Sequence, residues 1–397
     1  MEKIRLIKYS LLLVSIFLLH ALLLINFQFT LWPEMVVYPY LINKGFLIYK
    51  DIINPYPPFF SEFLSFFSKI FGYLPLPYQI LTWIIIFTID FSIFKVVYKI
   101  AGNYYQAFSA LFFFVVFSIP FGVNGLWFDL AQTPIIVFSV YYFYNYTKYQ
   151  KKQDLQKSFF LVIFAFFIKQ QVLWLIIFYL GFLIIFQKDK FQKLKKILLL
   201  QFAVFSLIFL IQIVFFYKQG TLNDFLFWTV YQPLFRGSSL PGYVSLPTLK
   251  QLAILALPYF LVAHLTIFSK EKKLFITLLA LPLIMFAYPR FDYFHLIPYL
   301  AIVAVSLGVH LKGLRVNHVL LPIGFLFLLS IFAIHQYRLF WDKPIRFFER
   351  DVLTAASLIE AVTPQNGIIY IQNGPDQLLP LSGRLSVKPW AIQFPWY

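Results

Sequence analysis

The chain has 397 residues, of which 61% are hydrophobic and 12% charged, and it carries a formal net charge of +17. Because a soluble domain is about 45–50% apolar and about 25% charged, this composition excludes an ordinary soluble protein. The sequence contains no cysteine, which excludes disulfides, thiolate metal sites and cysteine nucleophiles.

Apolar runs of roughly 20 residues recur along the chain, and this length crosses about 30 Å of hydrocarbon. The runs are continuous, whereas the strands of a membrane barrel alternate, and a backbone in lipid must satisfy its amides internally. We therefore predict an all-α polytopic membrane protein. Hydropathy and breaker residues predict about eleven spans, at residues 8–29, 78–98, 105–121, 130–147, 158–168, 172–187, 197–217, 248–268, 273–289, 296–311 and 319–336.

The basic residues predict how these spans are oriented. They gather in short connections between the runs, a pattern typical of cytoplasmic loops rather than of a surface that binds nucleic acid. The first run is too long for a secretory signal and lacks a small-residue cleavage site, so we expect a retained helix with a cytoplasmic N-terminus. The inner cations are then Lys95, Lys99, Lys148, Lys151, Lys152, Lys157, Lys188, Lys190, Lys193, Lys195, Lys196, Lys270, Lys272, Lys273, Lys312 and Arg315.

Two longer segments between spans are predicted on the outer face, where most acidic residues also fall. The first, residues 30–77, contains the apolar stretch Phe59–Phe71 with interspersed polar residues, a pattern typical of a helix in the membrane interface. The second, residues 218–247, is polar and contains Gly220, Gly237 and Gly242. Asp90 lies instead within the second span, where a structural hydrogen bond or ion pair is favoured over a functional role.

The C-terminal tail is the third outer segment. Its pattern predicts an amphipathic helix over Ile345–Val362 and a short strand over Ile368–Gln372. We therefore predict two parts, a transmembrane domain over residues 1–336 and an extracytoplasmic α/β tail over residues 337–397. No internal repeat is evident.

The first outer loop carries the strongest pattern for chemistry. It reads Trp32-Pro33-Glu34, then Gly45-x-x-x-Tyr49-Lys50-Asp51, and then Tyr56-Pro57-Pro58. A carboxylate just beyond the first span lies where water meets lipid, so it can accept a proton from a hydroxyl while a lipid substrate stays embedded. The alternative is an ordinary polar loop with a helix N-cap.

Further polar residues lie at the predicted outer ends of other spans. Asp129 precedes the fourth span as either a functional acid or a helix N-cap. Lys169-Gln170-Gln171 interrupts a long apolar run, and its lysine can either meet a lipid-linked phosphate or snorkel to the surface. Between spans nine and ten, Arg290 can make a bidentate contact with a phosphate, and His295 can donate a hydrogen bond to a phosphate or a sugar hydroxyl. Asp292 fits a structural ion pair with Arg290.

These residues and the architecture resemble the GT-C glycosyltransferases, in particular the bacterial mannosyltransferase and aminoarabinose-transferase-like groups. The architectural likeness covers most of the chain, and the motif-level likeness covers residues 32–58, 127–129, 169–171 and 288–298. Members of this family take sugars from polyprenyl-phosphate donors. Their first acidic residue is commonly an Asp, often paired with another acid, whereas this chain has the single Glu34.

The resemblance implies a GT-C-like enzyme of the cell membrane that transfers a sugar from a polyprenyl-phosphate donor to an extracytoplasmic hydroxyl, with inversion. The acceptor would be a lipid, a glycan or a protein. Glu34 would act as the general base, and the other two catalytic residues, Asp51 and Asp129, would hold acceptor or sugar hydroxyls. The residues expected to bind substrate are Tyr56, Lys169, Gln170, Gln171, Arg236, Arg290 and His295.

The alternatives are a non-enzymatic carrier or flippase of lipid-linked sugars, and a ligase or polymerase of lipid-linked glycans. No Gly-rich nucleotide loop is present, which argues against nucleotide-sugar donors. We expect no cofactor, no metal site and no nucleic-acid partner.

Overall fold

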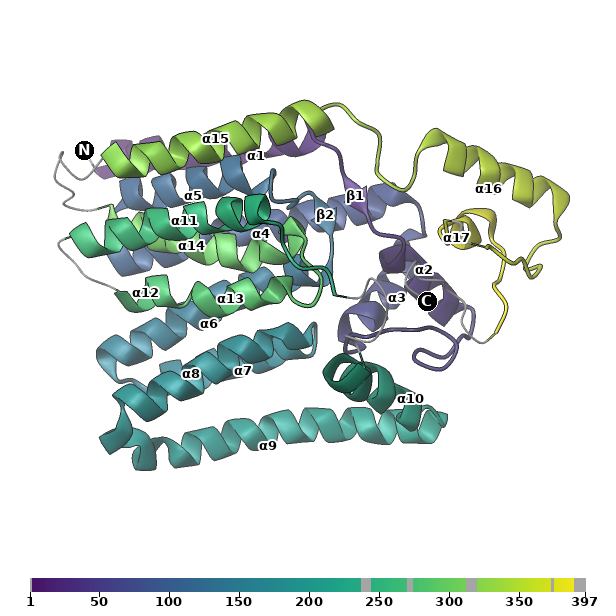
Figure 1. The fold of residues 1–397 in the computed structure, drawn as a ribbon, viewed down its shortest axis with the longest axis horizontal. Coiled ribbons are helices and arrows are strands. Elements are labelled where there is room, and N and C mark those ends of the chain that lie inside the picture. The colour runs from purple at the N-terminus through teal and green to yellow at the C-terminus, as the bar shows by residue number, and fades with distance from the viewer. Residues whose placement is uncertain (1, 237–243, 270–273, 312–319, 373–374, 389–397) are drawn as a thin grey trace.

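A computed structural model describes residues 2–236, 244–269, 274–311, 320–372 and 375–388. Long helices lie side by side in a bundle, with the N-terminus at one end (Figure 1). The elements of this bundle are α1 (Glu2–Asn26), α4 (Pro75–Ala101), α5 (Tyr104–Ser118), α6 (Phe128–Tyr149), α7 (Lys152–Phe166), α8 (Leu173–Phe186), α9 (Lys188–Gln219), α11 (Leu249–Phe268), α12 (Leu274–Leu278), α13 (Leu281–Ile284), η4 (Met285–Ala287), α14 (Ile297–His310) and α15 (Leu320–Phe340).

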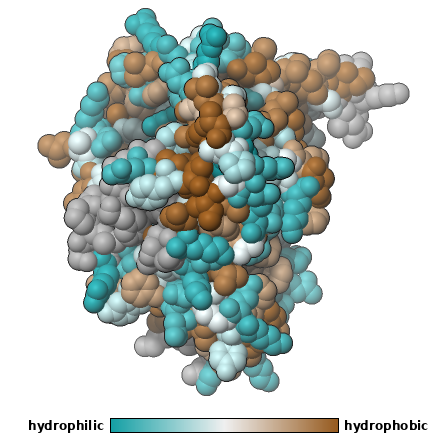
Figure 2. All heavy atoms as spheres, turned by 90° about the vertical axis from the view of Figure 1, so that its right-hand side faces the viewer, coloured by the Kyte–Doolittle hydropathy of each residue, from teal (hydrophilic) through white to brown (hydrophobic). Residues whose placement is uncertain are grey.

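Short elements gather at the opposite end of the bundle, and this end is seen face-on in Figure 2, where hydrophilic residues are interrupted by apolar patches. Two strands there, β1 and β2, pair in parallel. The short elements are β1 (Thr30–Leu31), α2 (Glu34–Asn43), α3 (Phe59–Phe71), β2 (Gly125–Leu126), η1 (Gln170–Val172), α10 (Leu222–Leu226), η2 (Phe227–Arg236), η5 (Tyr293–Leu296), α16 (Arg350–Val362) and α17 (Leu378–Ser382).

Local residue chemistry explains several helix boundaries. Pro75 begins α4 at a position whose N–H would lack a helical partner anyway, and Gly102 ends it with a left-handed φ of 67°. Asn103 then caps α5 by accepting a hydrogen bond from a backbone N–H of the first turn. Thr248 and Gln251 form a reciprocal capping box at the start of α11.

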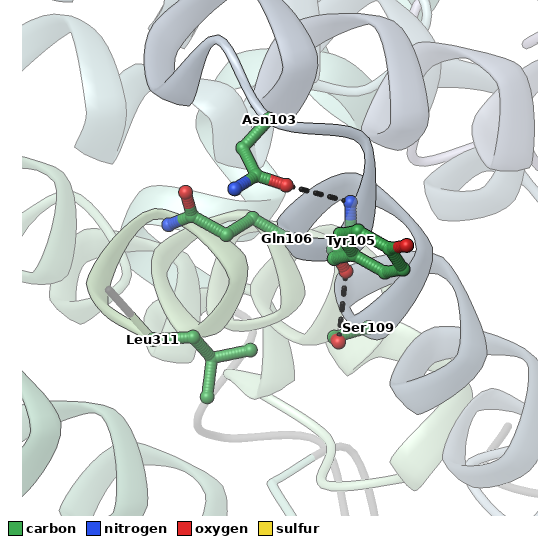
Figure 3. A pocket seen from close by; sticks show the side chains of 5 residues that line it. All are labelled: Asn103, Tyr105, Gln106, Ser109 and Leu311. Atoms are coloured by element: carbon green, nitrogen blue, oxygen red, sulfur yellow. Dashed lines mark hydrogen bonds between the residues drawn. The ribbon is translucent and has the colours of Figure 1, made fainter. Parts of the chain in front are cut away.

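The most buried helix of the bundle is α14, every residue of which is buried. It approaches α5 closely at Gly308, where an added Cβ would lie only 2.7 Å from the Cβ of Ala110. The side-chain N–H of Gln106 also donates to the Gly308 carbonyl oxygen at 2.8 Å. A cavity of about 220 Å³ lies beside this contact (Figure 3), lined by Asn103, Tyr105, Gln106, Ser109 and Leu311.

Within the described residues, six helices are long and apolar enough to cross a membrane, and three shorter apolar segments accompany them. The α6 and α7 helices stand at the predicted fourth and fifth spans but belong to neither group. Helical structure therefore occupies each of the predicted spans, and the fold is compatible with an all-α membrane protein. The number of crossings and their direction stay predictions.

The expected interface helix Phe59–Phe71 is α3, with the same bounds as predicted. Its aromatic side is exposed at Phe63 and Phe66, while Ser61 and Ser65 are buried. Asp90 has an ion-pair partner as expected, because its Oδ2 lies 2.6 Å from Nδ1 of His20 on α1, and both side chains are fully buried.

Two predictions in the tail were wrong in detail. The helix begins at Arg350 rather than Ile345, because the preceding segment runs beside β1, where the Arg346 N–H donates to the Phe29 carbonyl oxygen. The predicted strand Ile368–Gln372 is reduced to one bridge with Leu385, since the short link after α17 offers a single pairing position. Outside the described residues lie Gly237, Gly242, Lys270, Lys272, Lys273, Lys312 and Arg315.

Candidate active site

Parallel pairing of β1 with β2 brings two acidic residues into equivalent positions. Leu31 pairs with Leu126, and three residues beyond each leucine stand Glu34 and Asp129, each in the first turn of a helix. The tryptophans one residue beyond each leucine contact each other edge to face, with ring centroids 5.5 Å apart. The chain thus repeats Leu-Trp-x-acid, at 31–34 and 126–129. Comparing the two segments directly would have shown this short repeat in the sequence.

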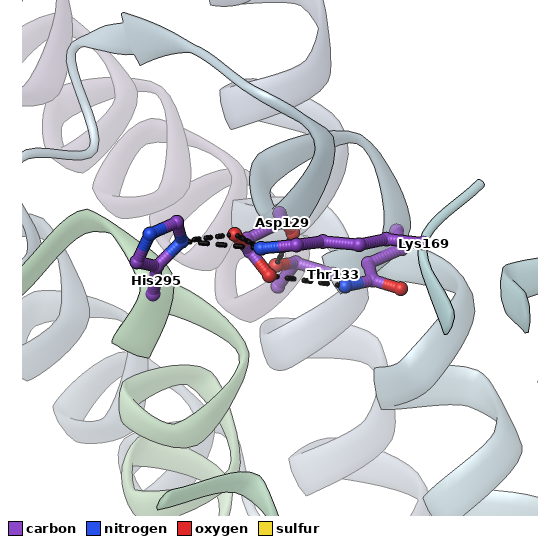
Figure 4. Close-up of polar contacts among 5 residues, drawn as sticks. Asp129, Thr133, Lys169 and His295 are labelled. Atoms are coloured by element: carbon purple, nitrogen blue, oxygen red, sulfur yellow. Dashed lines mark hydrogen bonds and ion pairs between the residues drawn. The ribbon is translucent and has the colours of Figure 1, made fainter. Parts of the chain in front are cut away.

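Asp129 belongs to a buried ionic cluster with two other predicted site residues (Figure 4). Its Oδ2 accepts a hydrogen bond from Lys169 Nζ at 2.5 Å and lies 2.6 Å from His295 Nδ1. The Asp129 and Lys169 side chains are fully buried, and that of His295 is 9% exposed. Since buried charges need partners, these three residues from distant parts of the chain stabilise one another.

The contacts of Asp129 show that it is not the N-cap of α6. The N-cap position of α6 is Trp127, which makes no side-chain cap. The second carboxylate oxygen of Asp129 accepts from Gln132 Nε2 at 3.2 Å, and its backbone carbonyl oxygen accepts from the Thr133 hydroxyl. The carboxylate therefore serves the cluster rather than the helix end.

Lys169 lies deep in the protein instead of snorkelling to the surface. Besides Asp129, its ammonium group lies 3.2 Å from His295 Nδ1 and 5.5 Å from the centre of the Tyr56 ring, a distance typical of a cation–π contact. When Nδ1–H donates to Asp129, the neutral imidazole keeps Nε2 as its proton acceptor. In that tautomer, the cluster holds the ring through Nδ1 and leaves Nε2 outside the contacts with Asp129 and Lys169.

Glu34 lies in different surroundings from Asp129. It is half-buried, and its Oε2 is shielded from solvent without a hydrogen-bond partner among the described residues. Burial raises the pKa of Glu34, an effect that a backbone hydrogen bond and the charge of Arg290 partly offset. Shielded acceptors without partners are rare in folded proteins, so this oxygen is suited to receive a donor from a bound molecule.

Aromatic rings pack around the two acidic segments. Trp32 contacts Phe294 and Phe347, with ring centroids 4.9 and 5.3 Å apart. Trp127 contacts Tyr56 at 6.0 Å, and its ring N–H is buried with no partner among the described residues. Aromatic faces with a nearby polar donor suit ligands that have both apolar and hydroxyl-bearing faces.

Arg346 is a site residue that the sequence analysis missed. Its guanidinium lies 5.5 Å from the Trp32 ring and 4.9 Å from the Phe347 ring. Burial raises the pKa of Asp292, and the charges of His295 and Arg346 offset part of this rise. The sequence places Arg346 among several cations that follow the last predicted span, such as Arg338 and Lys343, and nothing there singled out its return to β1.

The glutamines after Lys169 join this region to the first outer loop. Gln170 donates from Nε2 to the carbonyl oxygen of Pro55 at 2.7 Å. The side-chain oxygens of Gln170 and Gln171 are both shielded and have no hydrogen-bond partner in the described part of the chain. They therefore add two acceptors directly after Lys169 in the chain.

The remaining predicted residues stand apart from the cluster in their described contacts. Asp51 Oδ2 accepts from the Leu47 N–H at 2.9 Å and pairs with Lys388 at 3.0 Å, which ties the first loop to the tail. Arg236 ends η2 and is exposed. In the described ranges, no group of three or more histidine or acidic side chains is arranged to hold a metal ion.

Comparison with family models gives no match for this chain, and comparison with curated proteins gives none either. The resemblance to GT-C enzymes accordingly rests on the residues and architecture described above.

Proposed function

We propose that this protein is a membrane glycosyltransferase that moves a sugar from a polyprenyl-phosphate donor to an acceptor hydroxyl outside the cytoplasm. The observation that supports this most is the strand pairing that places Glu34 and Asp129 in matching positions. Asp129 is engaged by Lys169 and His295, while Glu34 keeps a shielded oxygen without a partner among the described residues. Titratable groups held in contrasting surroundings are typical of acid–base chemistry.

In the proposed reaction, Glu34 accepts the proton of the acceptor hydroxyl as the hydroxyl oxygen attacks the anomeric carbon of the donor sugar. The bond from that carbon to the phosphate oxygen breaks, and the lipid phosphate leaves as an anion. Attack opposite the leaving group inverts the anomeric carbon. Because Lys169 is already paired with Asp129, Arg290 supplies most of the charge that stabilises the leaving phosphate.

The proposed location is the cell membrane, with the N-terminus in the cytoplasm and the acidic site outside. This follows from the short basic connections predicted at one end of the bundle. The chain has no native cysteine, so Lys44→Cys and Lys152→Cys each introduce one exposed thiol. In intact cells, an impermeant maleimide should label position 44 and leave position 152 unlabelled. The reverse pattern would overturn the proposed orientation.

Donor consumption is the direct test of the activity. Purified protein should release labelled sugar or transfer it to an acceptor from at least one member of a panel of radiolabelled polyprenyl-phosphate sugars. Glu34→Gln should lower this turnover on the order of 10²–10⁴-fold, whereas Glu360→Gln, which removes an exposed acid on α16, should leave it unchanged. A folded wild-type protein that binds these donors but leaves all of them intact contradicts the proposed reaction.

A carrier of lipid-linked sugars is the second candidate, and the buried His20–Asp90 pair favours it. Ionisable pairs inside a membrane often mark proton or ion pathways. In proteoliposomes, a carrier would move a fluorescent polyprenyl-phosphate sugar between leaflets, and His20→Gln would slow this movement. Transfer chemistry without such movement favours the enzyme.

A further inference from the structure

A cavity of about 590 Å³ lies between α7, α8 and α9. Its wall is apolar except for Lys195 and Gln201, with Phe166, Ile176 and Phe202 representative of the lining. These three helices run alongside one another in the bundle (Figure 1). None of the lining residues belongs to the Asp129–Lys169–His295 cluster.

The position of the cavity favours a hydrocarbon chain as its occupant. The apolar part of α9, Leu194–Gln219, is long enough to cross a membrane, and only 11% of its most apolar window is buried in the protein. Large side chains along it, such as Leu207 and Ile211, are exposed. An apolar cavity of this size does not hold ordered water well, whereas acyl chains surround such a helix in a bilayer.

The two polar residues of the wall indicate the head group. Lys195 is exposed near the start of α9 and is followed by the exposed Lys196. Gln201 is only 6% exposed, and its side-chain oxygen has no hydrogen-bond partner among the described residues. A helix rises about 1.5 Å per residue, so the glutamine lies roughly 9 Å deeper than Lys195 along the helix axis.

A phospholipid presents its groups in the same order along the membrane normal. Its phosphate lies outermost, its glycerol and ester groups lie deeper, and its acyl chains follow. Basic pockets between membrane helices bind anionic head groups. A lysine at the cavity mouth, a buried amide behind it and an apolar wall beyond match these three levels.

We propose that this cavity binds an anionic phospholipid of the leaflet nearest Lys195. The phosphate contacts Lys195, the Gln201 amide bonds the glycerol-ester region, and an acyl chain fills the apolar space. The bound lipid thereby packs α9 against α7 and α8. This proposal does not depend on the glycosyltransferase activity, because it uses a separate set of residues.

Lipid retention tests the proposal. The purified wild-type protein, equilibrated with equal amounts of phosphatidylglycerol and phosphatidylcholine and then washed, should keep phosphatidylglycerol in preference when analysed by native mass spectrometry. Lys195→Ala should lower phosphatidylglycerol affinity about tenfold or more, the effect of losing a charge-assisted contact. The matched control Lys99→Ala removes a cation at the end of α4, and it should keep the wild-type preference.

Two further variants test the cavity itself. Leu198→Trp and Ile176→Phe should each displace the acyl chain and lower retention of both lipids. Ile176→Phe provides an independent test if Leu198→Trp does not fold. Equal retention of the two lipids by wild type, unchanged by Lys195→Ala and by filling the cavity, overturns the proposal. The proposal is also overturned if polyprenyl phosphate displaces phosphatidylglycerol and Leu198→Trp raises the KM for the donor. That result would assign the cavity to the donor's lipid chain, and the proposed glycosyltransferase activity would still stand.

Discussion

The segments 31–34 and 126–129 share one local pattern and differ in what surrounds their acids. Each runs from a short parallel strand through a tryptophan to a carboxylate in the first turn of a helix. Asp129 is enclosed by Lys169, His295 and Gln132. Glu34 has Arg290 nearby and one shielded oxygen that makes no hydrogen bond within the described residues.

This difference in surroundings suggests different roles for the two acids, although their sequence patterns are alike. A carboxylate whose oxygens are occupied by a buried lysine and a histidine holds the structure and orients its neighbours. A carboxylate with an unoccupied buried oxygen can accept a proton from a bound molecule. In the proposed reaction, the same backbone arrangement therefore supplies one positioning acid, Asp129, and one proton acceptor, Glu34.

The largest effect that this contrast predicts is on turnover in Glu34→Gln. Glutamine preserves the side-chain volume but does not accept a proton at neutral pH, and general-base catalysis contributes on the order of 10²–10⁴-fold. Turnover of the labelled donor should fall by that factor while the melting temperature stays near that of wild type. Wild-type turnover in a folded Glu34→Gln protein would move the base to His295, which His295→Gln would then test.

Asp129→Asn should show the opposite pattern, with its main effect on stability. Removing one partner of a buried ion pair leaves the other charge uncompensated, which costs about 3–5 kcal/mol. A clear drop in melting temperature is expected, and Asp129→Asn combined with Lys169→Met should restore part of it. Asp51→Asn is the matched control, because its partner Lys388 is 48% exposed and exposed pairs contribute little. Equal melting temperatures for Asp129→Asn and Asp51→Asn would contradict the contrast.

The helical segments could be predicted from the sequence, whereas the grouping of their end residues could not. Runs of apolar residues and breakers such as Pro75 and Gly102 give helix positions directly, because membrane crossing and backbone sterics act locally. The contact of Asp129 with His295 joins residues 166 positions apart, and it depends on how η5, which leads into α14, packs against α6. Polar residues at the ends of spans indicated a site, but their partners emerged only from the tertiary structure.

Arg290→Ala should change donor affinity more than stability. In the proposed reaction its guanidinium meets the donor phosphate, and charge-assisted contacts contribute roughly 1.5–3 kcal/mol, equivalent to about a tenfold to hundredfold loss in affinity. Binding of a radiolabelled polyprenyl-phosphate sugar measures this loss. Arg338→Ala, which removes an exposed arginine in the last turn of α15, should bind like wild type. Equal donor binding by both variants would remove Arg290 from the phosphate site.

The smallest expected effect is on the pH dependence of the wild-type protein, whose activity and stability should change in opposite directions as pH rises. Burial raises the pKa of Glu34 above the ordinary value of about 4.3. The proposed base must be deprotonated, so kcat/KM should rise with pH through this raised pKa, at a higher pH than an ordinary glutamate would give. Stability should change in the other direction, because the folded protein holds the Glu34 proton more tightly than the unfolded chain does.

The stability that Glu34 contributes is therefore fully present below its unfolded pKa and is lost as pH rises through its folded pKa. Relative to Glu34→Gln, which has no titrating carboxyl at this position, wild type should become less stable over the same pH range in which its activity increases. Melting temperatures of both proteins and wild-type kcat/KM, measured across one pH series, compare the two curves. An acid limb at the ordinary glutamate pKa, with parallel melting curves, would show that Glu34 is solvated like any surface acid and would remove the distinction between it and Asp129.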